Sequence, residues 1–496
     1  MSIKEVVSPL EKAKQFIKEN RGNVHPRYRP YYHATTPIGW MNDPNGFVYY
    51  EGEYHLFYQF YPYDSQWGPM HWGHVKSKDL IHWEELPVAL APDQPYDKDG
   101  CFSGSAIVKD GKLYLMYTGH VVEGEQVIQT QCIASSNDGI KFEKALNNPV
   151  IGESLLGSEG IINDFRDPKV IEHQGTYYSV VATKTSDNRG KILLFSSEDL
   201  IEWAFFSVLL EGDSEQGIMW ECPDLFHLDG KDVLIMSPIQ IKKKEHEFHN
   251  ISSTMACIGK MDWETGKLEV ENIHEMDYGM DYYAPQTLVD DKNRRIVIAW
   301  MQMWDRTLPT HDLGHKWAGS MTLPRELKVR NNRLVQRPVS EVYSQLEYQY
   351  GSENIQVTDH PVVFHRLIKD NTYMQVVADL SEAKSFTIQL AKQQNQHLRL
   401  NYQTDTSTFT FSRKDFGYEI KGAENETIDT RSFPVDLVNH QLILEIFRDT
   451  NSIEIFVNGQ EVQTATFYEI EKGTDLVFIS EGKTRIGSFE IASIKV

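Results

Sequence analysis

The sequence repeats with a period of about 60 residues, and this repeat restricts the possible folds more than any other feature. A turn followed by an apolar strand occurs five times, at Gly52, Gly111, Gly175, Gly230 and Asn293. The successive turns are 59, 64, 55 and 63 residues apart. A strand-rich unit repeated at this spacing is typical of a β-propeller, in which each blade holds four strands.

A second pattern has the same period. The motif Ser-x-Asp-x-Ile-x-aromatic occurs at residues 77–83, 136–142 and 197–203, with starts 59 and 61 residues apart. A two-sheet sandwich would not produce a fixed period of this kind. We therefore predict an all-β chain in which residues 31–335 form a five-bladed β-propeller.

The character of the sequence changes near residue 340. All ten tryptophans lie at or before Trp317, and short alternating segments such as residues 453–457 (IEIFV) follow. This segment ends at Asn458-Gly459, a dipeptide typical of two-residue hairpins. We therefore predict an antiparallel β-sandwich over residues 351–496, joined to the propeller by a linker at residues 336–350.

Charge, cysteine content and the N-terminal segment limit the class of protein. The formal net charge of −22 argues against a nucleic-acid or anionic-membrane partner, since both require a basic face. Residues 1–30 are expected to form an N-terminal helical extension and not a signal peptide, because charges interrupt their apolar residues. Four cysteines without a Cys-x-x-Cys pair indicate reduced thiols in a cytoplasm and no zinc site. The predicted location is therefore cytoplasmic.

Three carboxylates occupy similar places in three of the repeats. Asp43 and Asp167 are each followed by a proline, and Glu221 is followed by Cys222-Pro223. The acids stand nine, eight and nine residues before the repeat glycine of their blade. Equivalent positions on successive blades are related by rotation about the propeller axis, so we expect the three acids to converge in one central funnel.

Clustered carboxylates in a funnel without a basic run are compatible with two kinds of chemistry. One is a metal site, but a calcium loop places acids at alternate positions around a glycine, and the sequence contains no such loop. The other is acid–base catalysis on a neutral, hydroxyl-rich substrate, as when two carboxylates flank a glycosidic bond. Aromatic residues near the predicted funnel favour a sugar, and about half of them are expected to belong to the core between blades. They are Trp40, Trp67, Trp72, Phe102, Trp220, Trp300 and Trp304.

Six short motifs surround these acids: residues 40–46 (WMNDPNG), 57–61 (FYQFY), 102–106 (FSGSA), 165–168 (FRDP), 220–224 (WECPD) and 283–287 (YAPQT). They resemble those of the β-fructofuranosidases, the invertase, levanase and sucrose-6-phosphate hydrolase group of retaining glycosidases. The resemblance covers nearly the whole chain. Residues 67–74 (WGPMHWGH) and 317–327 (WAGSMTLPREL) are most similar to the bacterial intracellular sucrose-6-phosphate hydrolases. The resemblance implies a five-bladed propeller followed by a β-sandwich, with no cofactor and no metal.

The resemblance also implies a role for each acid. Asp43 would be the nucleophile, Glu221 the general acid and then the base, and Asp167 the residue that holds fructose hydroxyls. The fructose subsite would be lined by Asn42, Gln59, Trp67, Phe102, Ser103, Arg166 and Trp300. Because an acid has to keep its proton near neutral pH, we expect Glu221 to lie among apolar and anionic neighbours.

The implied substrate is a small sugar: sucrose, sucrose 6-phosphate or a short fructo-oligosaccharide. A phosphate on glucose would require a cation beside the funnel, and the candidates are Lys184, Arg189, Lys242, Lys243, Lys244, Arg306, His311 and His315. Three other interpretations stay open: a fructanase that acts on levan or inulin, an inverting propeller glycosidase that acts on arabinose polymers, and a non-catalytic sugar-binding propeller. The sequence does not indicate an oligomeric state.

Overall fold

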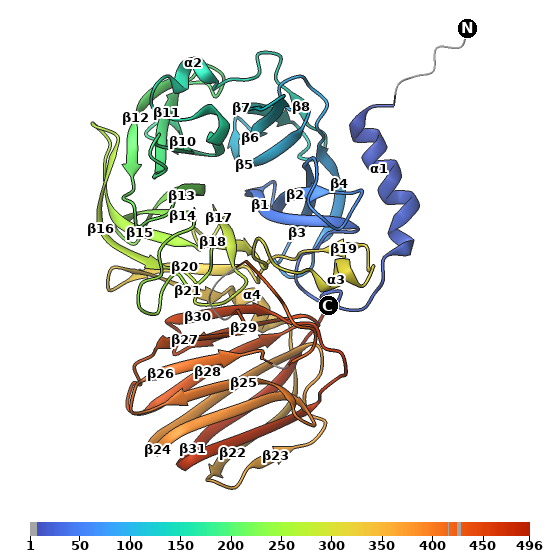
Figure 1. Cartoon of the computed structure of the whole chain (residues 1–496), viewed down its shortest axis with the longest axis vertical. Helices are drawn as coiled ribbons and strands as arrows, with labels where there is room; N and C mark the ends of the chain where they lie inside the picture. The colour runs from blue at the N-terminus through green and yellow to red at the C-terminus, as the bar shows by residue number, and fades with distance from the viewer. Residues whose placement is uncertain (1–6, 415, 424–427) are drawn as a thin grey trace.

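The chain folds into two β domains (Figure 1), and the computed structural model describes residues 7–414, 416–423 and 428–496. The N-terminal domain is a ring of five sheets, and the C-terminal domain lies below it in the view of Figure 1. Helix α1 (Pro9–Asn20) lies at the outer edge of the ring, with Ala13 and Ile17 buried. Residues 1–6 of the expected N-terminal extension lie outside the described residues. None of the described helices has the length and apolar character of a membrane span.

Each blade of the ring contains four antiparallel strands, which confirms the predicted five-bladed propeller. In chain order the strands are β1 (Gly39–Tyr50), β2 (Glu53–Tyr61), β3 (His71–Ser77) and β4 (Glu84–Leu90); β5 (Gly100–Lys109), β6 (Lys112–Glu123), β7 (Gln126–Ser136) and β8 (Glu143–Lys144); β9 (Arg166–His173), β10 (Thr176–Lys184), β11 (Gly190–Ser197) and β12 (Ala204–Glu211); β13 (Met219–Leu228), β14 (Lys231–Ile239), β15 (Met255–Asp262) and β16 (Lys267–Glu275); and β17 (Tyr283–Val289), β18 (Arg295–Trp300), β20 (Arg325–Arg330) and β21 (Arg333–Pro338). Short helical turns lie in the connections: η1 (Arg21–Asn23), α2 (Glu153–Leu156), η2 (Ile162–Asp164) and α3 (Pro309–Asp312).

Strand β19 (Trp317–Ala318) closes the ring. It follows β18 of the fifth blade in the chain but pairs in parallel with β1 of the first blade, where Gly39 lies opposite Trp317. Apolar side chains reinforce this junction, since Met41 of the first blade and Ile298 of the fifth belong to one buried cluster. Main-chain pairing and shared packing therefore hold the last blade against the first.

The first sequence repeat is the turn between the first and second strands of each blade. The turn residues Gly52, Gly111, Gly175, Gly230 and Asn293 have φ values of 84°, 74°, 85°, 80° and 57°. Positive φ costs little for glycine and is tolerated by asparagine. A Cβ added at any of the four glycines would meet no atom within 4 Å. The backbone conformation, and not lack of space, therefore explains these glycines.

The second repeat is the turn between the third and fourth strands of the first three blades. In the first blade, Oδ1 of Asp79 accepts hydrogen bonds from the backbone N–H groups of Ile81 and His82 at 3.0 and 2.8 Å. Asp138 and Asp199 accept the corresponding pairs of bonds in the second and third blades. The aspartate of the motif thus replaces backbone acceptors in the same tight turn, as Asp commonly does.

The C-terminal domain is a sandwich built from one 10-stranded sheet that folds over a single apolar core. Its strands are β22 (Leu346–Val357), β23 (Val362–Phe364), β24 (Thr372–Gln393), β25 (Gln396–Gln403), β26 (Thr408–Ser412), β27 (Thr430–Pro434), β28 (Gln441–Arg448), β29 (Ser452–Val457), β30 (Glu461–Thr466) and β31 (Asp475–Ile494). The long strands β24 and β31 pair with each other across several register shifts, so each contributes to both layers. The connection between the domains is shorter than the predicted linker at 336–350, because β21 ends at Pro338, α4 spans Ser340–Ser344, and β22 begins at Leu346.

Buried ion pairs join the two domains. His33 of the propeller domain places Nδ1 2.8 Å from Asp449 and Nε2 2.8 Å from Glu454 of the sandwich, and all three side chains are fully buried. Nε of Arg325 donates to the same Glu454 at 3.0 Å. Its Nη1 donates to Asp277 at 2.9 Å. Charges from both domains are therefore needed to neutralise this part of the interface.

Candidate active site

The three predicted acids converge at one end of the inner strands. Asp43 lies near the start of β1, Asp167 near the start of β9 and Glu221 near the start of β13. All three line one cavity of about 390 Å³. The inner strands β1, β5, β13 and β17 are arranged around the centre of the ring in Figure 1. The expected convergence in a central funnel is therefore present in the structure.

Every inner strand is irregular beside this cavity. Register shifts fall at residues 41–44, 102–104, 166–169, 221–224 and 283–286. Consecutive residues of a regular strand point to opposite faces, and a bulge breaks this alternation and re-aims a side chain. As a result two neighbouring side chains from one strand line the cavity in three of the blades, namely Asn42 with Asp43, Phe102 with Ser103, and Arg166 with Asp167.

Relative to the bulge of its own strand, Glu221 stands one residue earlier than Asp167 does. The shifted segments begin at Arg166 in β9 and at Glu221 in β13, so Cys222 is the residue equivalent to Asp167. Both have positive φ, 64° for Asp167 and 50° for Cys222. The Sγ atom of Cys222 consequently lies among the acids, 3.4 Å from Oδ2 of Asp43 and 3.6 Å from Oδ2 of Asp167.

Asp43 is buried and surrounded by hydrogen-bond donors. Nδ2 of Asn42 donates to its Oδ1 at 3.0 Å, and Oγ of Ser103 donates to its Oδ2 at 2.8 Å. Nε1 of Trp40 donates to Oδ1 of Asn42 at 2.7 Å and fixes the orientation of the amide. Burial and the charge of Glu221 raise the pKa of Asp43, while the hydrogen bonds from Asn42, Ser103 and Cys222 oppose this rise. A carboxylate held in this way has a fixed orientation toward the cavity.

Asp167 has the environment of an acid that resists ionisation. Burial comes first among the causes and the charge of Glu221 second, and together they raise its pKa from 3.8 to about 7. The guanidinium of Arg166 and the backbone N–H of Cys222, which donates to Oδ2 at 2.9 Å, act in the opposite direction. Two neighbouring buried carboxylates do not readily ionise together, so the charge of Glu221 makes the ionisation of Asp167 costly.

Glu221 has the anionic neighbours that we expected, since its charge acts on both Asp43 and Asp167, but hydrogen-bond donors and not apolar groups hold its carboxylate. Nε and Nη2 of Arg166 donate to its Oε1 at 3.1 and 2.9 Å, and the buried hydroxyl of Tyr283 donates to its Oε2 at 2.6 Å. Arg166 also donates to Asp164 at 3.0 Å and to Gln129 at 3.2 Å. The expectation of apolar neighbours was wrong because Arg166 and Tyr283 precede the equivalent bulges of the blades on either side, which directs both toward Glu221.

The cavity brings together nine of the ten residues predicted for the site. Asn42, Asp43, Gln59, Trp67, Phe102, Ser103, Arg166, Asp167 and Glu221 line it. Trp300 is fully buried, with its ring 5.7 Å from that of Trp40 and 4.9 Å from that of Trp304, and Trp304 lines the cavity instead. Of the seven aromatics considered, Trp40, Trp72, Trp220 and Trp300 are buried and act as core.

Sequence reasoning did not place six of the lining residues in the site. They are His120, Val127, Gln129, Asn163, Asp164 and Trp304. Trp304 was among the candidate aromatics, but nothing local distinguishes it from Trp300. Gln129 lies on β7 and belongs to none of the short motifs. Its Oε1 nevertheless accepts hydrogen bonds from the backbone N–H of Phe165 at 3.1 Å and from Arg166. Its role depends on contacts between blades, which a single sequence does not reveal.

Comparison with known proteins agrees with this architecture. Residues 33–338 match the glycosyl hydrolases family 32 N-terminal domain, and residues 341–495 match the family 32 C-terminal domain. The chain belongs to glycosyl hydrolase family 32. A sucrose-6-phosphate hydrolase of Escherichia coli is 38% identical over 461 residues, which cover 91% of each chain.

Two solved structures are similar to this chain over nearly its whole length. The sucrose-6-phosphate hydrolase of Lactobacillus gasseri superposes with a TM-score of 0.86 at 28% identity and covers 97% of this chain and 96% of its own. A Bombyx mori family 32 β-fructofuranosidase superposes with a TM-score of 0.82 at 32% identity and covers 98% and 97%. The propeller and the sandwich of this family 32 chain thus keep the arrangement found in these relatives.

Most of the cations considered for phosphate binding have structural partners. Arg189 pairs with Asp187 and Glu211, Lys242 with Glu215 and Arg306 with Asp281, while His311 contacts Ser65 and His315 stacks on His25. Lys184 is different, because its Nζ lies 3.0 Å from Oδ2 of Asp164, a residue of the cavity wall. Lys184 is therefore tied directly to the cavity wall.

Proposed function

We propose that this chain is a retaining β-fructofuranosidase that hydrolyses sucrose 6-phosphate. The observation that carries the proposal is the pairing of two differently held acids in one cavity: Asp43 is oriented by Asn42 and Ser103, and Glu221 is held by Arg166 and Tyr283. A retaining glycosidase needs one carboxyl group to attack and a second to exchange a proton. The names of family 32 relatives support the choice of sucrose 6-phosphate.

In the first step, Asp43 attacks the anomeric carbon of fructose and forms a fructosyl ester. The bond from that carbon to the bridging oxygen breaks, and protonated Glu221 donates its proton to the leaving oxygen. The donors from Asn42 and Ser103 keep one orientation of the Asp43 carboxylate, so little reorganisation is needed. Glucose 6-phosphate then leaves with its new hydroxyl group.

In the second step, the ionised Glu221 takes a proton from water, and the resulting hydroxyl attacks the same anomeric carbon. The ester bond breaks, Asp43 becomes a carboxylate again, and the configuration at the carbon is that of the substrate. Arg166 and Tyr283 stabilise the ionised form of Glu221 that this step requires. Asp167 accepts hydrogen bonds from fructose hydroxyls on the opposite wall.

We assign the phosphate preference to Lys184. Asp164 holds its ammonium group beside the cavity on the side of Glu221, where the leaving group departs. Replacement of Lys184 by Met is expected to lower kcat/KM for sucrose 6-phosphate about tenfold and leave that for sucrose unchanged, because one charge-assisted bond is lost. An equal effect on both substrates would contradict this assignment.

A direct comparison of substrates tests the proposal as a whole. We expect kcat/KM to be highest for sucrose 6-phosphate, lower for sucrose and lowest for inulin. A preference for inulin would make the protein a fructanase, and release of fructose from none of the three would support a binding protein. The four free cysteines, three of them buried, support the cytoplasmic location proposed for it.

A further inference from the structure

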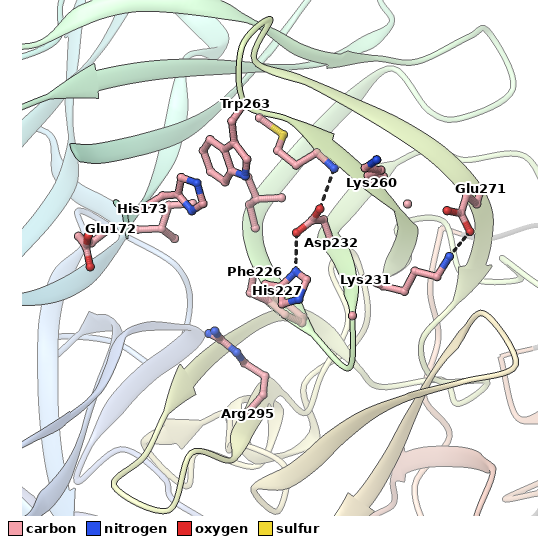
Figure 2. Close-up of a pocket in the computed structure, with 15 residues that line it drawn as sticks. Glu172, His173, Phe226, His227, Lys231, Asp232, Lys260, Trp263, Glu271 and Arg295 are labelled. Atoms are coloured by element: carbon pink, nitrogen blue, oxygen red, sulfur yellow. Dashed lines mark hydrogen bonds and ion pairs between the residues drawn. The ribbon is translucent and has the colours of Figure 1, made fainter. Parts of the chain in front are cut away.

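A second cavity opens at the opposite end of the inner strands. It has a volume of about 700 Å³, compared with about 390 Å³ for the cavity that holds the acids. Its walls come from the ends of β9 and β13, from β14, β15 and β16 of the fourth blade, and from Arg295 at the start of β18 (Figure 2). Because the acids lie at the starts of β9 and β13, the two cavities occupy opposite faces of the ring.

Two close pairs of polar side chains lie on the fourth-blade wall of this second cavity. Nζ of Lys231 lies 2.5 Å from Glu271, and Nδ1 of His227 lies 2.8 Å from Asp232. Figure 2 shows these two pairs along the wall formed by the fourth blade. The lining also includes the exposed Lys260 of the same blade and Glu172 of the third blade, which accepts a hydrogen bond from the backbone N–H of Gly175.

Arg295 differs from the exposed Lys260 because it is half-buried. It forms no ion pair with any carboxylate among the described residues, and its Nε is shielded from solvent without a hydrogen-bond partner. Its remaining interactions are weak ones: Nη1 donates to Oγ1 of Thr287 at 3.2 Å, and the guanidinium lies 4.7 Å from the ring centre of Phe226. Burial lowers the pKa of Arg295 despite the charge of Asp224, which is itself paired with Lys169 at 3.0 Å.

A partly buried cation without a counter-ion lowers the stability of a folded protein. Groups of this kind are often found where a ligand supplies the missing partner. A guanidinium presents a planar fork of donors that matches the oxygens of phosphate or carboxylate. In Figure 2 the guanidinium of Arg295 projects from the lower wall, facing the part of the cavity where His173 and Trp263 lie.

The opposite wall is aromatic. The rings of His173 and Trp263 stack with their centres 4.0 Å apart at an interplanar angle of 7°, although they come from different blades. Such a flat, rigid surface suits the apolar face of a ring-shaped ligand. The cavity therefore combines a half-buried cation that forms no ion pair among the described residues with an aromatic wall.

We propose that this cavity is a second ligand site, which binds a small organic oxyanion through Arg295 and packs the body of that ligand against Trp263. The anionic group is a phosphate or a carboxylate. The volume suits a ligand of the size of a sugar phosphate or a citrate. This site is separate from the catalytic one and does not depend on the function proposed above.

The experiment measures anion binding to the full-length protein by titration calorimetry. The probes are inorganic phosphate, citrate, glucose 6-phosphate and neutral glucose, each tested on the wild type and on Arg295→Met. We expect the variant to bind at least one anionic probe at least about tenfold more weakly, as for the loss of a charge-assisted hydrogen bond, with no change for glucose. Binding at the catalytic cavity is common to both proteins and cancels in the comparison.

Arg485→Met is the matched control, since Arg485 is an exposed arginine of the sandwich that donates to Asn354. It removes the same charge far from the cavity and is expected to leave anion binding unchanged. The relative response to phosphate, citrate and glucose 6-phosphate identifies which oxyanion the site prefers.

Thermal unfolding separates a binding role from a structural one. Without anions, Arg295→Met is expected to be at least as stable as the wild type, because an unpaired charge has been removed, and it is expected to keep its fructose release. Arg295→Gln, which keeps a donor for Thr287, serves as a second variant if the first folds poorly. Equal anion affinities in wild type and variants, or no Arg295-dependent binding of any probe at 10 mM (roughly the limit of a useful affinity), would overturn the proposal.

Discussion

Replacement of His33 by Gln should destabilise the protein by an amount that depends on pH. His33 bridges Asp449 and Glu454 of the sandwich at 2.8 Å on both sides. Burial alone would lower the pKa of His33, but the hydrogen bonds and charges of these two acids outweigh it and raise the pKa from 6.5 to about 9. The folded protein therefore holds this proton more tightly than the unfolded chain does.

The size of the effect follows from the two pKa values. A rise from 6.5 to about 9 corresponds to about 3 kcal/mol of stability from the protonated imidazole. Because the folded-state pKa is the higher one, this contribution is fully present below pH 6.5. It declines as the pH rises toward 9 and is lost above that value. Glu454 keeps its bond from Arg325 in the variant, so the predicted loss is an upper bound.

Urea unfolding at pH 6.0 and pH 9.5 measures this difference. All ten tryptophans lie between Trp40 and Trp317, so their fluorescence reports the propeller, while circular dichroism reports both domains. We expect His33→Gln to be less stable than the wild type by about 3 kcal/mol at pH 6.0 and by about 1 kcal/mol at pH 9.5. Comparison at each pH cancels the contributions of other titrating groups.

His365→Gln is the control for this experiment. His365 also pairs with an aspartate, Asp475, at 2.9 Å, but its side chain is 76% exposed. Exposed pairs contribute little, so this variant should match the wild type at both pH values. A stability gap for His33→Gln that is the same at pH 6.0 and pH 9.5 would refute the argument from the buried charge.

Three further predictions concern catalysis. Asp43→Ala should lower fructose release by at least about a thousandfold without a change in the urea midpoint, and a variant that kept a tenth of the wild-type rate would exclude Asp43 as the nucleophile. Proton NMR of the first product should show β-fructofuranose; initial appearance of the other anomer would mean inversion. Tyr283→Phe removes the 2.6 Å bond to Glu221 and should lower kcat by about ten- to a hundredfold with little change in KM. An unchanged kcat would show that this hydroxyl has no part in the reaction.

The arrangement of blades was predictable because it depends on local chemistry that repeats. A positive φ at Gly52 and its equivalents, and a turn capped by Asp79 and its equivalents, recur wherever the same turn recurs. Spacing alone therefore gave the number of blades and placed three acids at one end of the inner strands. The residue types within the motifs then suggested which other residues share the cavity.

Features that depend on register and on contacts between blades were not predictable. A bulge shifts Glu221 by one residue relative to Asp167, and no composition rule reveals this shift. The same shift brings Arg166 to Glu221, which a sequence argument based on apolar neighbours did not anticipate. Trp300 and Trp304 differ by four positions in one segment, and only packing against Trp40 decides which of them faces the cavity.

The charged contacts between the domains determine whether either domain of this enzyme can be produced without the other. A propeller expressed without its sandwich would expose Arg325 and His33 after removal of Glu454, their shared counter-ion. The sandwich alone would in turn retain acids that have lost their cations. Domain exchange with another member of the family should therefore succeed only when the residues at these positions are transplanted as a matched set.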